Sequence, residues 1–120
     1  YRRRIERDGN KFAEESIRAM MLPLLDIIDD LEKALENAND AKLPYVEGLR
    51  IIHKKFLFLL ETNGVVPFEC VGIPFDHNLH EAVAMATHEG SEPRTVVDEL
   101  RRGYLWNNQL LRAAQVRVSG

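Results

Sequence analysis

Apolar residues in the first third of the chain recur at the spacing of a helix that buries one face. Six of them follow one another at intervals of four, three, four, three and four residues: Ile17, Met21, Leu24, Ile28, Leu31 and Leu35. This alternation is typical of the a and d positions of a heptad repeat and predicts a long amphipathic helix. Pro23 lies within the pattern. Because proline removes a backbone donor, we predict a kink or break in the turn before it.

A second amphipathic helix is predicted after a short polar connection. Residues 37–43 are rich in Asn, Asp and Ala, and Pro44 suits the first turn of a helix. The heptad spacing returns at Tyr45, Leu49, Ile52, Phe56 and Leu59. Asn63-Gly64 predicts a left-handed end to this helix. Since the connection is short, we expect the two helices to form an antiparallel hairpin.

The apolar faces of the two helices are wider than one seam, because Met20, Leu25, Ile27, Ile51 and Leu60 extend them. Each large apolar side chain left in water forfeits roughly 1.5–3 kcal/mol. A second copy of the hairpin would cover these faces in a four-helix bundle about a twofold axis. The alternative is packing against the C-terminal half of the same chain. We expect the homodimer, with an interface formed by Ile17, Met21, Leu24, Ile28, Leu31, Leu35, Leu49, Ile52, Phe56 and Leu59.

The period of the apolar pattern changes to two after Gly64, which predicts short strands. The segments that alternate, or are rich in β-formers, are 66–71, 95–97, 103–106 and 114–118, while 80–87 is unsuited to a long helix. Gly90-Ser91-Glu92-Pro93 predicts a turn, and Asn107-Asn108 a two-residue hairpin turn. We therefore expect an α+β fold, with a helical dimerisation region at 1–63 and a small all-β domain at 64–120.

Composition narrows the classes of protein to consider. The chain has 120 residues, 45% of them apolar and 29% charged, with a net charge of −3. A mildly acidic total argues against a nucleic-acid binder. The longest nearly apolar stretch, Ala19 to Leu25, is far shorter than the roughly 20 residues of a membrane span.

Cys70 is the only cysteine, so no internal disulfide forms. The charged segment Tyr1–Arg7 reads as the middle of a helix, and we interpret the chain as part of a longer protein.

Metal-dependent hydrolysis is one candidate chemistry. The residues that could bind a cation are Asp76, His77, His80, Glu81 and His88. Their spacing is not His-Glu-x-x-His, and a third ligand is missing from any pair. The favoured interpretation is structural: Asp76 and Asn78 bond to the backbone of a turn, and His80 is partly packed.

No other catalytic arrangement is evident. Ser16, Ser91 and Ser119 lack the Gly-x-Ser-x-Gly context of a nucleophile, and Cys70 looks like a small core residue. The glycine-rich patterns that hold phosphates are absent. We therefore expect no catalytic residue, no cofactor and no direct nucleotide binding.

Several short motifs follow one another along the whole chain. They are Tyr-Arg-Arg-Arg-Ile-Glu-Arg at 1–7, Leu-Glu-Lys-Ala-Leu at 31–35, Val-Glu-Gly at 46–48, Pro-Phe-Asp-His-Asn-Leu-His-Glu-Ala at 74–82, Gly-Tyr at 103–104, Leu-Arg at 111–112 and Ala-Gln-Val-Arg-Val at 114–118. Together and in this order they resemble the GrpE family, the nucleotide exchange factors of DnaK-type heat-shock chaperones. The departures are His77 for the usual Pro, Trp106 for Leu, Gln109 for Arg, and a Pro23 displaced by about three residues. Gln109 cannot offer the charged fork of an arginine.

The resemblance implies a homodimer with a long helix pair, a four-helix bundle and two β wings. One wing would bind the ATPase domain of a chaperone and stabilise its open lobe, which weakens ADP binding. The partner contacts implied by the family are Gly48, Leu100, Asn108, Gln109 and Val118, with Tyr104 and Pro74 as supports of the surface. It also implies the bacterial cytoplasm, rather than a mitochondrial matrix or plastid. The alternative function is a dimeric coiled-coil adaptor with no effect on nucleotide release.

Overall fold

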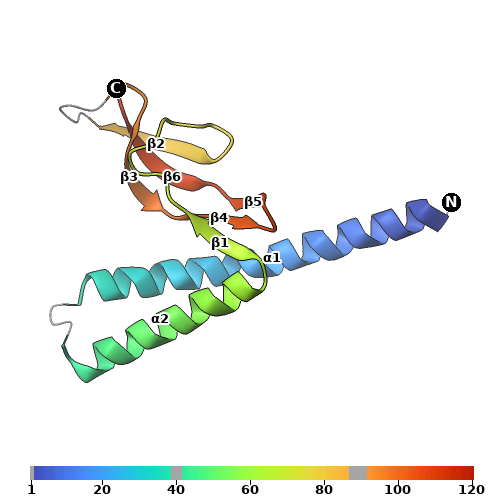
Figure 1. Ribbon diagram of the computed structural model, residues 1–120, viewed down its shortest axis with the longest axis horizontal. Helices are drawn as coiled ribbons and strands as arrows, with labels where there is room; N and C mark the ends of the chain where they lie inside the picture. Colours follow the sequence, from blue (N-terminus) through green and yellow to red (C-terminus); the bar gives the residue numbers. More distant parts are fainter. Residues whose placement is uncertain (1, 39–41, 87–91) are drawn as a thin grey trace. The chain divides into compact units, whose positions relative to one another are not determined.

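The structure is a computed structural model that describes residues 2–38, 42–86 and 92–120, with side chains from residue 9 onward. The described residues form two helices followed by six strands (Figure 1). Their bounds are α1 Arg2–Glu36, α2 Pro44–Thr62, β1 Val65–Phe68, β2 His80–Ala86, β3 Val96–Arg101, β4 Gly103–Trp106, β5 Gln109–Arg112 and β6 Ala114–Ser119. The α+β class is confirmed. The chain divides into two compact units, residues 1–49 and 50–120.

Helix α1 runs through Pro23 without interruption, so a break at this residue is wrong, while the kink stays a prediction. Proline removes one backbone hydrogen bond and crowds the carbonyl four residues earlier, at a cost of about 3 kcal/mol. Pro23 and Ala19 are both exposed, so the carbonyl that loses its donor lies where water can solvate it. Leu25 and Ile28 are buried in the next turn. Apolar burial therefore favours continuation of the helix past the proline.

Helix α2 begins at Pro44 and ends at Thr62, as the sequence predicted. Side chains satisfy a carbonyl in its last turn. The Thr62 hydroxyl and the side-chain amide of Asn63 both donate to the carbonyl oxygen of Leu59, at 2.7 and 2.8 Å. Gly64 follows with a φ of +84°, a conformation that costs little only for glycine. The predicted left-handed end at Asn63-Gly64 is confirmed. The antiparallel arrangement of the two helices stays a prediction.

The strands form two three-stranded sheets, with strand orders β1-β4-β5 and β2-β6-β3. The first sheet is antiparallel throughout, whereas in the second β2 runs parallel to β6 and β3 antiparallel to it. The predicted strands at 103–106 and 114–118 are confirmed within one residue, whereas the strand predicted at 95–97 is longer, since β3 extends from Val96 to Arg101. The predicted turn at 90–93 falls partly on Gly90 and Ser91, which lie outside the described residues.

The strands and their described connections between Val65 and Ser119 are called the β unit below. The second sheet packs its inner face into the core of this unit. Cys70, Val96, Ala114, Val116 and Val118 are buried together, with Phe68 and Phe75 against them. Cys70 is a core residue as predicted, but the expectation that it lies within a strand is wrong. Strand β1 ends at Phe68, and the chain then turns so that the Gly72 amide donates to the carbonyl of Val96, at 2.9 Å. This hydrogen bond attaches the segment after Cys70 to β3.

The two sheets approach each other closely at Gly103, the first residue of β4. A Cβ atom placed there would lie 2.3 and 2.6 Å from ring carbons of Phe68 and 2.7 Å from the backbone nitrogen of Ala114. Only glycine fits this space, because the Ala114 backbone belongs to the other sheet and cannot move aside alone. Gly103 therefore allows β4 to approach both the Phe68 ring and the start of β6.

Substituting this glycine tests the importance of the close approach. Gly103→Ala should lower the free energy of unfolding of the β unit by about 2–3 kcal/mol, as overpacking of a filled interior does. Urea unfolding followed by the fluorescence of Trp106, the single tryptophan, measures the change. Gly120→Ala is the control, since its Cβ would meet only the flexible end of Met85 at 3.2 Å. Equal stability of the two variants would contradict the assignment.

Candidate functional site

The β4–β5 hairpin presents two of the residues that the sequence analysis assigned to partner contact. Asn107 and Asn108 form its two-residue turn with φ angles of 50° and 67°, so the predicted hairpin turn is confirmed. The Asn107 amide donates to the carbonyl of Gly64 at 2.9 Å, which ties the turn to the end of α2. Asn108 and Gln109 are exposed. The hairpin therefore exposes both side chains on a short, anchored loop.

Leu100, a third expected contact, lies near the end of β3. The pairing of β3 with β6 shifts register between Glu99 and Arg101, and such a bulge redirects the local side chains. Leu100 is 52% exposed as a result. This placement leaves a large apolar side chain available on the strand that leads into the β4–β5 hairpin.

Pro74 and Val118 belong to the other end of the β unit. Pro74 is exposed and forms an isolated bridge with Thr95, whose amide donates to the hydroxyl of Ser119 at 3.0 Å. Figure 1 shows that the end of β6 lies far from the β4–β5 turn within this unit. Val118 is only 8% exposed and packs in the core, whereas its register partner on β2, Met85, is 71% exposed. Little of the Val118 side chain is thus available to a partner, and Met85, which sequence reasoning did not single out, is the accessible residue there.

Tyr104, expected to support the contact surface, is fully buried in β4. Its cross-strand partner is Arg112, the last residue of β5, whose guanidinium carbon lies 5.3 Å from the centroid of the Tyr104 ring. Arg112 is itself buried. The sequence analysis used Arg112 only as part of a motif, because a buried arginine gives no periodic pattern that would distinguish it from a surface residue.

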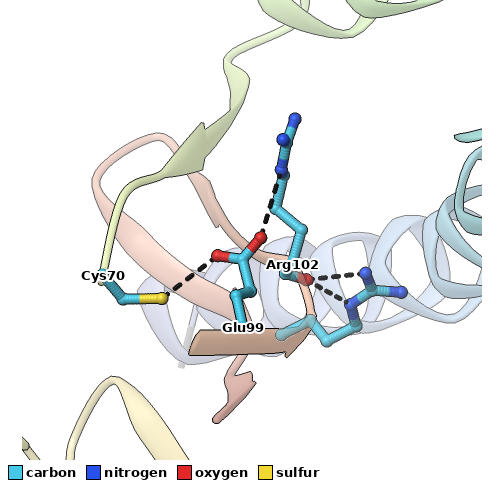
Figure 2. A network of polar contacts seen from close by, with 4 residues as sticks. Cys70, Glu99 and Arg102 are labelled. Carbon is cyan, nitrogen blue, oxygen red and sulfur yellow. Dashed lines mark hydrogen bonds and ion pairs between the residues drawn. The ribbon is translucent and has the colours of Figure 1, made fainter. Parts of the chain in front are cut away.

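A chain of polar contacts connects four segments of the β unit (Figure 2). The Cys70 thiol donates to Oε2 of Glu99 at 3.1 Å, and Oε1 of Glu99 lies 3.5 Å from Nε of Arg102. The backbone carbonyl of Arg102 accepts two hydrogen bonds from Arg112, from Nε at 3.0 Å and from Nη2 at 2.6 Å. Segments after β1, in β3, between β3 and β4 and at the end of β5 are therefore linked by side chains.

A cavity of about 440 Å³ lies beside these contacts. It is lined by Pro67, Phe68, Glu69, Cys70, Val71, Glu99 and Arg102. Burial, reinforced by the hydrogen bond to Glu99, raises the pKa of the Cys70 thiol from 9.0 to about 12. A protonated thiol is a poor nucleophile and a poor metal ligand. The cavity therefore does not supply cysteine chemistry at neutral pH.

The protonation of Cys70 gives a prediction about reactivity and pH. At pH 8 the folded thiol should react with 5,5′-dithiobis(2-nitrobenzoate) at least about 100-fold more slowly than the urea-unfolded chain. Because the pKa is higher in the folded state, the stability that the thiol contributes is complete below about pH 9 and is lost as the pH rises toward 12. Cys70→Ala should abolish this part of the alkaline loss. Equally fast reaction of folded and unfolded thiols would contradict the account.

The histidine-rich segment is held by the turn that the sequence predicted. The Asn78 amide donates to Oδ1 of Asp76 at 2.9 Å, and the Asp76 amide donates to Nδ1 of His80 at 3.0 Å. The His80 ring is buried with Phe68 and Phe75 near it, at centroid distances of 6.3 and 5.9 Å. No three metal-ligating side chains come together in the ranges that the structure describes. The candidate ligand His88 lies outside those ranges.

The helices carry the remaining candidate residues. Of the ten expected at a dimer interface, Ile28 is buried within the single chain, and Ile52 and Leu59 are 54% and 59% exposed. The other seven are half-buried: Ile17, Met21, Leu24, Leu31, Leu35, Leu49 and Phe56. A Cβ atom at Gly48 would have no neighbour within 4 Å. Gly48 is therefore not required by packing within this chain.

Comparison with known proteins gives one consistent family. A model of the GrpE family matches residues 1–120. Protein GrpE of Syntrophobacter fumaroxidans is 41% identical over 120 residues, covering 98% of this chain and 64% of that protein. Protein GrpE of Geobacillus kaustophilus is 37% identical over 124 residues, covering 99% and 57%. Protein GrpE of Chloroherpeton thalassium is 38% identical over 115 residues, covering 91% and 55%. The chain thus spans somewhat more than half the length of these relatives.

Neither described helix combines the length and apolar character needed to cross a membrane.

Proposed function

The chain belongs to the GrpE family, and from this premise we propose that it is the dimerising and chaperone-binding part of a nucleotide exchange factor. It binds the ATPase domain of a DnaK-type chaperone and promotes the release of ADP. The helical region, residues 1–63, forms the homodimer, and the β wing, residues 64–120, contacts the chaperone. The protein acts in the bacterial cytoplasm, and it is not an enzyme, because no bond is made or broken.

The mechanism is a linkage between two binding equilibria. A wing that binds the open form of the ATPase domain more tightly than the closed form shifts the population toward the open form. Since ADP prefers the closed form, the wing must weaken ADP binding by the same factor by which ADP weakens wing binding. The residues assigned to this contact are Gly48, Leu100, Asn108 and Gln109. They position one protein surface against another and need no nucleophile or metal.

The observation that carries the proposal is the exposure of Leu100, Asn108 and Gln109 on a well-packed scaffold. Leu100 is half exposed at a bulge, and the hairpin turn is held by a backbone hydrogen bond to Gly64. Pre-organised residues lose little conformational entropy on binding. The raised pKa of the Cys70 thiol and the burial of the His80 ring support a role in binding rather than in catalysis.

Release of a fluorescent ADP from the chaperone, followed by stopped flow, tests the proposal. At micromolar concentration the protein should accelerate the release of ADP at least about fivefold, which is the lower end of the typical coupling between two sites. Gly48→Asp should weaken chaperone binding with unchanged helix content, because a side chain at this position has room in the fold. Gly9→Asp, another helical glycine whose Cβ would meet no atom within 4 Å, is the matched control. Binding without acceleration would favour the adaptor, and an unfolded Gly48→Asp would overturn the contact assignment.

The homodimer is supported by apolar residues that a single chain leaves in water. On α2, Ile51, Ile52, Phe58 and Leu59 are all more than half exposed. They recur at intervals of seven residues, 51 with 58 and 52 with 59, so they follow one face of the helix. Contiguous exposed apolar surface of this kind is typical of protein interfaces. A second copy of the same helix would cover it symmetrically.

Charge placed in this face should separate the subunits. Leu59→Lys should convert the dimer to a monomer in sedimentation equilibrium at micromolar concentration, because burying an unpaired ammonium in an apolar interface is strongly unfavourable. Glu61→Lys changes an exposed residue on the same helix and should leave the dimer intact. A wild-type chain that sediments as a folded monomer at high concentration would contradict the proposal.

A further inference from the structure

The chain passes between the two sheets of the β unit over residues 69–79, from β1 to β2, and again at two single residues. Arg102 alone separates the end of β3 from the start of β4, and Ala113 alone separates the end of β5 from the start of β6. Strands β3 and β6 belong to one sheet, and β4 and β5 to the other. The backbone at these two crossings therefore sets how one sheet lies against the other.

Arg112 connects the two crossings. It is the last residue before Ala113, and its side chain donates through Nε and Nη2 to the carbonyl of Arg102 at 3.0 and 2.6 Å. Two donors of one planar group on one oxygen fix the direction of that carbonyl as well as its distance. The guanidinium also lies over the Tyr104 ring, and the residue is 94% buried, with 6% of its surface exposed. A lysine ammonium is a point charge and cannot reproduce this planar geometry.

The sheets joined in this way carry different parts of the expected contact surface. Leu100 lies on β3, two residues before Arg102, and Asn108 and Gln109 lie at the β4–β5 turn, within four residues of Arg112. The ion pair of Glu99 with Arg102 adds little rigidity, because its side chains remain 21% and 37% exposed.

We infer that Arg112 is a positioning residue: it locks the two sheets so that Leu100 and the Asn108–Gln109 turn form one surface for the chaperone. This inference rests on the proposed function and adds a residue that does not itself contact the partner. Arg112 acts through the carbonyl of Arg102 and the ring of Tyr104. Its loss affects the fit between two rigid surfaces rather than any single contact.

The test compares Arg112→Lys with Arg117→Lys. Arg117 pairs with Asp98 at the surface, with side chains 43% and 38% exposed, so its replacement should change chaperone affinity less than twofold. Arg112→Lys should weaken affinity at least about tenfold, since charge-assisted hydrogen bonds are lost. The maximal rate of ADP release at saturating concentration should stay within twofold of wild type. Such a split between affinity and maximal rate indicates a misplaced binding surface rather than a lost ability to stabilise the open ATPase domain.

Residual dipolar couplings of backbone amides provide a second measurement that does not depend on the chaperone. In the wild type, one alignment tensor should fit the couplings of both sheets, that is, of amides 96–101 and 114–119 together with amides 103–106 and 109–112. In Arg112→Lys each sheet should require its own alignment tensor. Unchanged affinity or a single alignment in the variant would overturn the inference. If the variant does not fold, two separate alignments in the wild type would overturn it. A wild type that fails to accelerate ADP release, with the couplings as expected, would instead reject the proposed function.

Discussion

The backbone of Gly103 lies so close to that of Ala114 that no side chain fits between them, and the architecture of the β unit depends on this contact. It lets β4 leave one sheet directly beside the strand that begins the other. The Phe68 ring fills the remaining space, and Arg112 fixes the neighbouring carbonyl. The six short strands of the described ranges, none longer than seven residues, can form a stable unit because their two sheets share this packed corner.

The β unit and the helices differ in how they remove apolar surface from water. The β unit buries its core residues among themselves, from Cys70 to Val118. The helices instead leave large apolar side chains such as Ile52 and Phe58 in water, which is why a second copy is the natural complement in the proposed dimer. Under the proposed function, dimerisation and partner contact can vary independently, because the residues assigned to them differ.

Local chemistry made much of the fold predictable. Pro44 marked the start of α2, Asn63-Gly64 its end, and Asn107-Asn108 the hairpin turn, because each depends on backbone preferences of one or two residues. Pro23 does not break α1, since burial of Leu25 and Ile28 outweighs the local cost of a proline. The roles of Gly103 and Arg112 were not predictable, because they arise from contacts between strands distant in sequence. The same reason explains why Val118, chosen by resemblance, proved to be a core residue.

Hydrogen exchange of the wild-type chain, with and without the chaperone ATPase domain, tests most directly whether the two sheets present one contact surface. The account predicts that amides at 100–102 on one sheet and at 107–109 on the other slow together and to a similar extent on complex formation. Protection confined to one of these segments, with the other exchanging as in the free chain, would contradict it.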